Sequence, residues 1–146
     1  MFLTSHIIPV PHLFTTRRGG VSRGVFDSMN LASGSGDLRD FFENVIENHD
    51  ICARSLGYTA HDVCRTFQAP TTCVEVVTAA DKGRGLFLPP FDHGVDGIVT
   101  RERGVVLSVR GADCPTILAC DAADGIIGAL HSGWRGTLEN AVGAPV

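Results

Sequence analysis

Six short runs of apolar and β-branched residues, separated by Gly, Pro and Asp, constrain the fold of this chain more than any other feature. Runs of this kind with turn residues between them are typical of strands. The longest connection between them, residues 80–94, contains Pro89 and Pro90 and predicts a surface loop. The expected strands are residues 63–68, 73–79, 95–100, 105–109, 116–120 and 125–130. This part of the chain therefore predicts a large sheet.

One amphipathic helix precedes these runs. An apolar series with helical spacing begins at Leu38 and continues to Leu56, which predicts a helix. Asp37 is the expected N-cap, and Gly57 is expected just past the C-terminal end. Residues 7–16, which carry β-branched residues in loose alternation, predict a strand before the helix.

Length and element order together predict the fold class. A second helix is expected to begin at Trp134 and to continue to Val142. The chain has 146 residues, which is enough to bury the core of one domain but not of two. We therefore expect one α+β domain over residues 1–146 with a large mixed sheet. The short final helix leaves an apolar surface that we expect a second copy to cover, as a homo-oligomer.

Charge and composition exclude several classes of partner. The net charge is -4, and no basic run is longer than Arg17-Arg18, so the clustered cations of a nucleic-acid surface are missing. No stretch approaches the ~18 consecutive apolar residues of a membrane span. Pro9 and Pro11 interrupt the N-terminal apolar residues, which argues against a signal peptide. Five cysteines without a Cys-x-x-Cys pair suit a reducing compartment. We expect a soluble, cytoplasmic protein that binds neither nucleic acid nor membranes.

The first candidate site is the turn that contains Cys114. Pro115 favours extended geometry at Cys114, which places the thiol at a strand boundary. One interpretation is a structural cysteine, because free cysteines are among the most buried residues. The neighbouring Asp113 would raise the pKa of the thiol, whereas a bound cation would deprotonate it. The pair therefore favours a metal site over a free nucleophile.

The second candidate site begins at His131. This residue follows the last expected strand, Gly133 permits a sharp turn, and the final helix begins at Trp134. Backbone N–H groups at a helix start, together with Arg135, suit a phosphate or carboxylate. The alternative interpretation is a turn with a packed Trp134 and a solvated Arg135.

Four separated motifs together resemble one known family. TTRRGGVS, MNL, ADC and HSGWRG follow the order and spacing of T-T-R-x-G-G-V-S, L-N-L, A-D-C and H-A-G-W-R-G in the laccase-domain, YfiH-type family. DGIVT resembles the D-A-L-V-T strand of that family, and Glu47-Asn48 resembles its helical E-N pair. In this chain the segments are residues 15–22, 29–31, 112–114, 131–136, 96–100 and 47–48.

The resemblance implies a fold and an activity. The fold is a layered α/β/β/α sandwich, and the activity is zinc-dependent cleavage of purine nucleosides with phosphate. Some members deaminate adenosine, and others are linked to the editing of peptidoglycan precursors. The older name, polyphenol oxidase, implies copper. A multicopper oxidase needs a large set of imidazoles, however, and this chain has only 6 His.

The resemblance also implies roles for individual residues. Zinc would be held by Cys114 and His131, which match two of the three ligand motifs of the family. Arg17 matches the arginine of T-T-R and is the candidate for binding phosphate or transition-state charge, because guanidinium groups bind oxyanions bidentately. The catalytic candidates are Cys114, His131 and Arg17. The substrate-binding candidates are Arg17, Asn30, Asp113 and Arg135.

The chain departs from the family at the third ligand motif. Where Q-x-H-G is expected, the sequence reads Gln68-Ala69-Pro70-Thr71. Proline has no metal-binding side chain, so zinc is expected to bind weakly or not at all unless Cys73 or His93 supplies the third donor. The part of the family fold that follows residue 146 is also missing from this sequence.

Three functions therefore stay open. The first is a zinc-dependent purine nucleoside phosphorylase or adenosine deaminase, weakened by the lost ligand. The second is a metal-free thiol hydrolase or deamidase that acts on cell-wall precursors with Cys114 and His131. The third is a non-catalytic, truncated paralogue. Metal content separates the first two, and activity in any assay separates both from the third.

Overall fold

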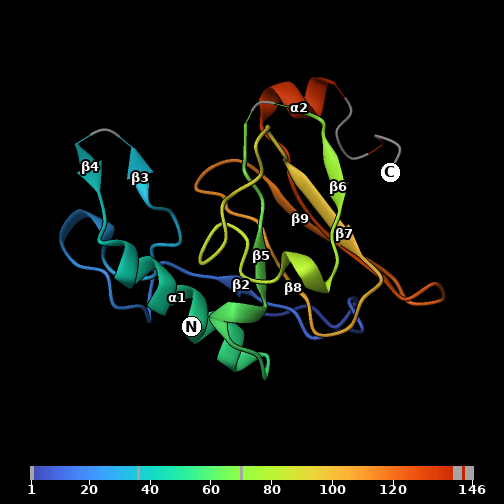
Figure 1. The fold of residues 1–146 in the computed structure, drawn as a ribbon, viewed down its shortest axis with the longest axis horizontal. Coiled ribbons are helices and arrows are strands. Elements are labelled where there is room, and N and C mark those ends of the chain that lie inside the picture. Colours follow the sequence, from blue (N-terminus) through green and yellow to red (C-terminus); the bar gives the residue numbers. More distant parts are fainter. Residues whose placement is uncertain (1, 36, 70, 140–142, 144–146) are drawn as a thin grey trace. The chain divides into compact units, whose positions relative to one another are not determined.

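The computed structural model describes residues 2–35, 37–69, 71–139 and 143 (Figure 1). Contacts within the chain divide it into two compact units, Met1–Ala60 and His61–Val146. The single domain expected from the length stays a prediction. Each unit is described below by itself.

The first unit contains two antiparallel strand pairs and the main helix, α1 (Figure 1). Its elements are β1 (Phe2–Leu3), β2 (Phe14–Thr15), η1 (Gly24–Phe26), β3 (Gly34–Ser35), β4 (Leu38–Arg39) and α1 (Phe42–Ser55). β1 pairs antiparallel with β2, and β3 pairs antiparallel with β4. The strand expected over residues 7–16 is therefore limited to β2. Pro9 and Pro11 lack the N–H groups that would extend the ladder.

The helix α1 begins later than its apolar pattern predicts. Asp37 is not the N-cap, because Leu38 and Arg39 pair with β3 as a strand; the N-cap is Phe41, which makes no side-chain capping bond. Leu38 and Phe41 are largely exposed, so they do not belong to the buried face. The expected C-terminal end is confirmed, since Gly57 follows the C-cap with a φ of 86° that favours glycine.

Asn48 of α1 holds the loop over residues 17–30. Its Oδ1 accepts a hydrogen bond from the Val21 N–H at 2.8 Å, and its Nδ2 donates to Ser22 Oγ, Ser28 O and Asn30 O at 2.9, 3.2 and 2.8 Å. The side chain is fully buried. A Cβ on Gly20 would clash with Ser28 O, so glycine is needed where these two backbone segments approach each other.

The second unit is built on a four-stranded mixed sheet (Figure 1). The strand order is β6-β7-β10-β9, in which β6 and β7 are parallel and the other pairs are antiparallel. A separate parallel pair joins β5 to β8, and α2 follows β10. The elements are η2 (Ala60–Asp62), β5 (Val63–Arg65), β6 (Val74–Val76), η3 (Ala79–Asp81), β7 (Gly97–Thr100), β8 (Val106–Ser108), β9 (Thr116–Asp121), β10 (Ile126–His131) and α2 (Trp134–Leu138).

All six expected strands contain an observed strand, and the α+β class with a mixed sheet is confirmed. The core of this unit packs one side of the sheet: Ile98 of β7 lies opposite Ala129 of β10, and both are buried. Burial raises the pKa of the core thiol Cys64 to about 12, so this cysteine is structural. The buried cluster is Cys64, Val77, Val95, Ile98, Val105 and Ala129.

No helix among the described residues combines the length and the apolar character that crossing a bilayer requires.

Candidate functional site

The strands β9 and β10 bring the two candidate motifs to the same end of the sheet. His131, the last residue of β10, lies opposite Thr116, the first residue of β9. Cys114 precedes β9 by one turn residue, and the Ser132 N–H donates to Pro115 O at 3.0 Å. The antiparallel register therefore places the Cys114 turn beside the start of α2.

A pocket of about 210 Å³ opens at this end of the sheet, and Cys114 and His131 both line it. Gly133 lies between them. A Cβ built on Gly133 would lie 3.8 Å from Cys114 Sγ and 3.9 Å from His131 Nε2. The structure thus brings the sulfur and the imidazole to one point of the pocket. The lining residues are Gln68, Ala69, Thr71, Asp96, Cys114, His131, Gly133, Trp134, Arg135 and Gly136.

Asp96 fixes the imidazole of His131, a role that the sequence motifs did not reveal. Its Oδ1 lies 2.8 Å from His131 Nδ1, its Oδ2 accepts from the Thr71 N–H at 3.0 Å, and its side chain is buried. The His131 N–H also donates to Asp96 O at 2.7 Å. A carboxylate on one ring nitrogen directs the other nitrogen to a metal or a reacting group. The signals in the sequence were a charged residue in an apolar strand run and its place at the start of the DGIVT segment.

The thiol of Cys114 is half-buried and is not activated by its surroundings. Desolvation, followed by the charge and the hydrogen bond of Asp113, raises the pKa of Cys114 above its ordinary value. A nucleophilic cysteine requires the opposite shift. The predicted effect of Asp113 on the thiol therefore agrees with the structure.

Arg17 and Asn30 belong to the first unit, where both make contacts within their own loop. The Arg17 guanidinium donates to the carbonyl oxygens of Val25 and Asp27. Asn30 Nδ2 donates to Ala32 O at 2.7 Å and to Asp40 Oδ2 at 2.9 Å. These bonds favour a loop-holding role for Asn30. The predicted substrate contacts of both residues stay predictions.

Arg135 lines the pocket from α2. Its guanidinium carbon lies 4.2 Å from the centre of the Trp134 ring, and both side chains are exposed. The helix α2 spans only five residues, Trp134–Leu138. A helix this short does not provide a phosphate site at its N-terminus. Trp134 is stacked on Arg135 rather than packed in the core, which corrects that interpretation of the turn.

The two proposed replacement ligands lie in a different group. Within residues 2–35, 37–69, 71–139 and 143, one set of three or more metal-binding side chains has its ligand atoms within 4.8 Å of one another, and it consists of Cys73, Glu75 and His93. Neither Cys73 nor His93 thus completes a three-donor cluster with Cys114 and His131. Pro70, where the family places its third ligand, lies outside the described residues.

Comparisons with known proteins agree with these motifs. A purine nucleoside phosphorylase of Deinococcus radiodurans is 41% identical over 131 residues, which is 90% of this chain and 46% of the relative. One from Bacteroides thetaiotaomicron is 33% identical over 91% of this chain and 48% of the relative. The chain thus spans about half the length of the curated relatives it matches.

Solved structures show the same fold. YlmD from Geobacillus stearothermophilus superposes with a TM-score of 0.78 at 33% identity, covering 88% of this chain and 47% of that chain. The Neisseria meningitidis protein NMB0706 superposes with a TM-score of 0.70 at 35% identity, covering 97% of this chain and 55% of that chain. The family model described as multi-copper polyphenol oxidoreductase laccase matches residues 11–146. The chain therefore belongs to this laccase-domain family, whose members include YlmD and YfiH.

Proposed function

We propose that this chain cleaves purine nucleosides with phosphate in the pocket formed by Cys114 and His131. The observation that carries the proposal is the Asp96–His131 pair, which presents the imidazole Nε2 beside the Cys114 sulfur. The names of the relatives, purine nucleoside phosphorylases, supply the substrate class. The five cysteines, all free, support our placement of the enzyme in the cytoplasm.

The pocket supplies two of the donors that zinc requires. Cys114 Sγ and His131 Nε2 have the right chemistry, but catalytic zinc is held by three protein ligands. With Pro70 at the third position, the donor set is incomplete, and we expect zinc to bind weakly or not at all. A bound zinc ion would polarise the nucleoside or lower the pKa of a bound water.

Phosphorolysis breaks the bond between C1′ of the ribose and a purine nitrogen. A phosphate oxygen forms the new bond to C1′, and the purine leaves with the electron pair and takes up a proton. In the metal-free pocket, the doubly protonated ring of His131 can donate that proton from Nε2 while its Nδ1–H stays on Asp96, which leaves the ring neutral. Arg135 lines the pocket and is a cation that phosphate can contact there. Deamination of adenosine, the second activity implied by the family, would use the same pocket.

The competing function is a thiol hydrolase, and one observation favours it. Asp96 contacts His131, and His131 lies beside Cys114, as an orienting acid, a base and a nucleophile do in a catalytic triad. The raised pKa of Cys114 opposes it, because an attacking thiolate needs a lowered pKa. Copper oxidation fits less well, because among the described residues the one cluster of three metal-binding side chains contains a single histidine.

The proposal is tested with the purified chain, inosine or adenosine, and phosphate. We expect release of the purine base and ribose 1-phosphate, measured by chromatography, only when phosphate is present. Cys114→Ser and His131→Ala should abolish the release, whereas Cys120→Ser, a half-buried thiol on β9, should not. Amide or ester hydrolysis that iodoacetamide blocks would show the thiol hydrolase instead. Inactivity in every assay would leave the non-catalytic paralogue.

A second prediction concerns Asp96 as a positioning residue. Asp96→Asn should lower zinc affinity and nucleoside cleavage by roughly 10- to 100-fold, the usual cost of losing the partner of a ligating histidine. The nitrogen chemical shifts of the His131 ring provide a direct readout, because the carboxylate holds the proton on Nδ1. We expect Asp96→Asn to move that proton to Nε2. Asp121→Asn, which removes an exposed turn carboxylate, is the matched control. Unchanged ring shifts would contradict the role.

A further inference from the structure

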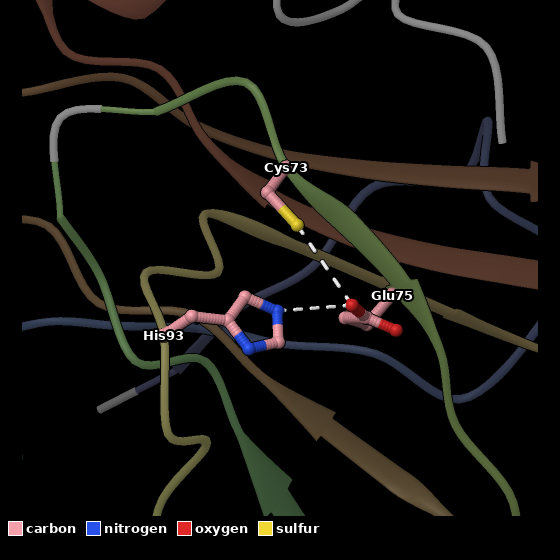
Figure 2. Close-up of side chains that lie close together, drawn as sticks. All are labelled: Cys73, Glu75 and His93. Atoms are coloured by element: carbon pink, nitrogen blue, oxygen red, sulfur yellow. Dashed lines mark hydrogen bonds and ion pairs between the residues drawn. The ribbon is translucent and has the colours of Figure 1, made fainter.

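Three metal-binding side chains, Cys73, Glu75 and His93, meet beside β6 (Figure 2). None of them lines the pocket of Cys114 and His131. Cys73 immediately precedes β6 and Glu75 lies within it, two residues on, so both side chains project from the same face of an extended chain. His93 reaches them from the loop before β7. Figure 2 shows the sulfur and the imidazole both directed at the same oxygen of the Glu75 carboxylate.

The distances in this group are close to those around a single ion. His93 Nε2 lies 3.0 Å from Glu75 Oε1, Cys73 Sγ lies 3.9 Å from the same oxygen, and all three ligand atoms lie within 4.8 Å of one another. Ligand atoms around a tetrahedral zinc ion are roughly 3 to 4 Å apart, given bonds of about 2.0 to 2.3 Å. Small side-chain rotations are therefore sufficient to form the site.

Asp92 orients the imidazole of His93. Its Oδ1 lies 2.7 Å from His93 Nδ1, which leaves Nε2 directed at Glu75 and Cys73. Carboxylates hold ligating histidines in this way in metal sites. The Asp92 side chain is almost fully exposed, and the His93 side chain is half exposed. An exposed ion pair of this kind contributes little to stability by itself.

We propose that Cys73, Glu75 and His93 form a metal site for a zinc-class divalent ion, separate from the pocket of Cys114 and His131. A thiolate and an imidazole select zinc over magnesium or calcium, which prefer oxygen donors. Three protein donors leave the fourth position to water. The ion would tie the loop over residues 80–94, which carries His93, to the edge strand β6. This inference does not depend on the proposed activity.

Cobalt(II) tests the site, because a thiolate bound to cobalt gives an intense charge-transfer band. The measurement is made on the intact chain carrying Cys114→Ser and His131→Ala, which removes both pocket donors. We expect one equivalent of cobalt with the thiolate band, displaced by zinc. Adding His93→Gln or Cys73→Ser should abolish the band, and adding Asp92→Asn should weaken binding by about tenfold. Cys120→Ser should leave the band unchanged.

Each outcome decides the proposal. His93→Gln is the safer variant, because His93 is half exposed, whereas Cys73 packs against the core cluster. Circular dichroism of every variant confirms that it is folded. A band that persists in both His93→Gln and Cys73→Ser would place the metal elsewhere and overturn the proposal. Absence of the thiolate band from the protein with Cys114→Ser and His131→Ala, which lacks both pocket donors, would also overturn the proposal.

Discussion

Replacing Pro70 by His is expected to raise the zinc affinity of the pocket by at least about tenfold. Losing a residue that only orients a metal ligand commonly lowers metal affinity by about tenfold or more, so gaining a direct ligand should raise it by at least as much. Ala69 and Thr71, on either side of residue 70, line the pocket of Cys114 and His131. A histidine there would supply the third protein donor that catalytic zinc requires. Removing a proline from a loop costs up to about 1 kcal/mol, which is smaller than the expected gain in binding.

The experiment is made in a His93→Gln background, so that the group on β6 does not contribute. Zinc retained after dialysis is compared between the background protein, the protein with Pro70→His added, and the protein with Pro70→His and His131→Ala added. We expect the most zinc in the second and a loss in the third. Equal and negligible zinc in all three would show that the pocket is not a metal site. Stoichiometric zinc in the background protein would show that another donor already completes it.

Asn48→Ala is expected to lower the free energy of unfolding by about 3 kcal/mol or more, because burying unsatisfied polar groups costs about 1 to 3 kcal/mol each. The Asn48 side chain makes four hydrogen bonds, to Val21, Ser22, Ser28 and Asn30. Ser28 O keeps a second bond, from the Ser22 N–H at 3.0 Å, whereas the Val21 N–H and Asn30 O would each lose their Asn48 partner. The loop over residues 17–30 should loosen first.

Urea denaturation gives the stability change, and amide hydrogen exchange locates it. Asn44→Ala is the matched control, because Asn44 lies one turn earlier on α1 and makes one hydrogen bond, to Asp40 Oδ1 at 3.0 Å. We expect this control to cost less than half as much and to leave exchange at residues 17–30 unchanged. A loss below about 1 kcal/mol in Asn48→Ala would mean that water replaces the asparagine.

The sequence predicted the elements well where one local pattern decided them. Turn residues bounded all six strand runs, and each run contains a strand. The predicted start of α1 was wrong, because Leu38 and Arg39 pair with Gly34 and Ser35 in a hairpin that apolar spacing does not reveal. The strand over residues 7–16 was too long because Pro9 and Pro11 cannot donate to a ladder.

The candidate site was predictable only in its motif residues. Cys114 and His131 were found because each sits at a turn beside an expected strand. Asp96 was missed because its contact with His131 depends on the pairing of β7 with β10, between residues far apart in the sequence. Cys73 and His93 were considered singly, since Glu75 joins them only once the loop returns to β6.

Asp96 and His131 are joined by two hydrogen bonds, one between their side chains and one between their backbones. These two residues are held by the sheet, whereas other residues that line the pocket lie on loops. His131 ends the interior strand β10, and Asp96 directly precedes the interior strand β7, so folding of the sheet sets the imidazole. Ala69, Thr71 and Cys114 lie instead on connections between strands. A donor on these connections can be exchanged without disturbing the imidazole. We therefore expect single substitutions on these connections to change the metal affinity of the pocket while the histidine stays in place.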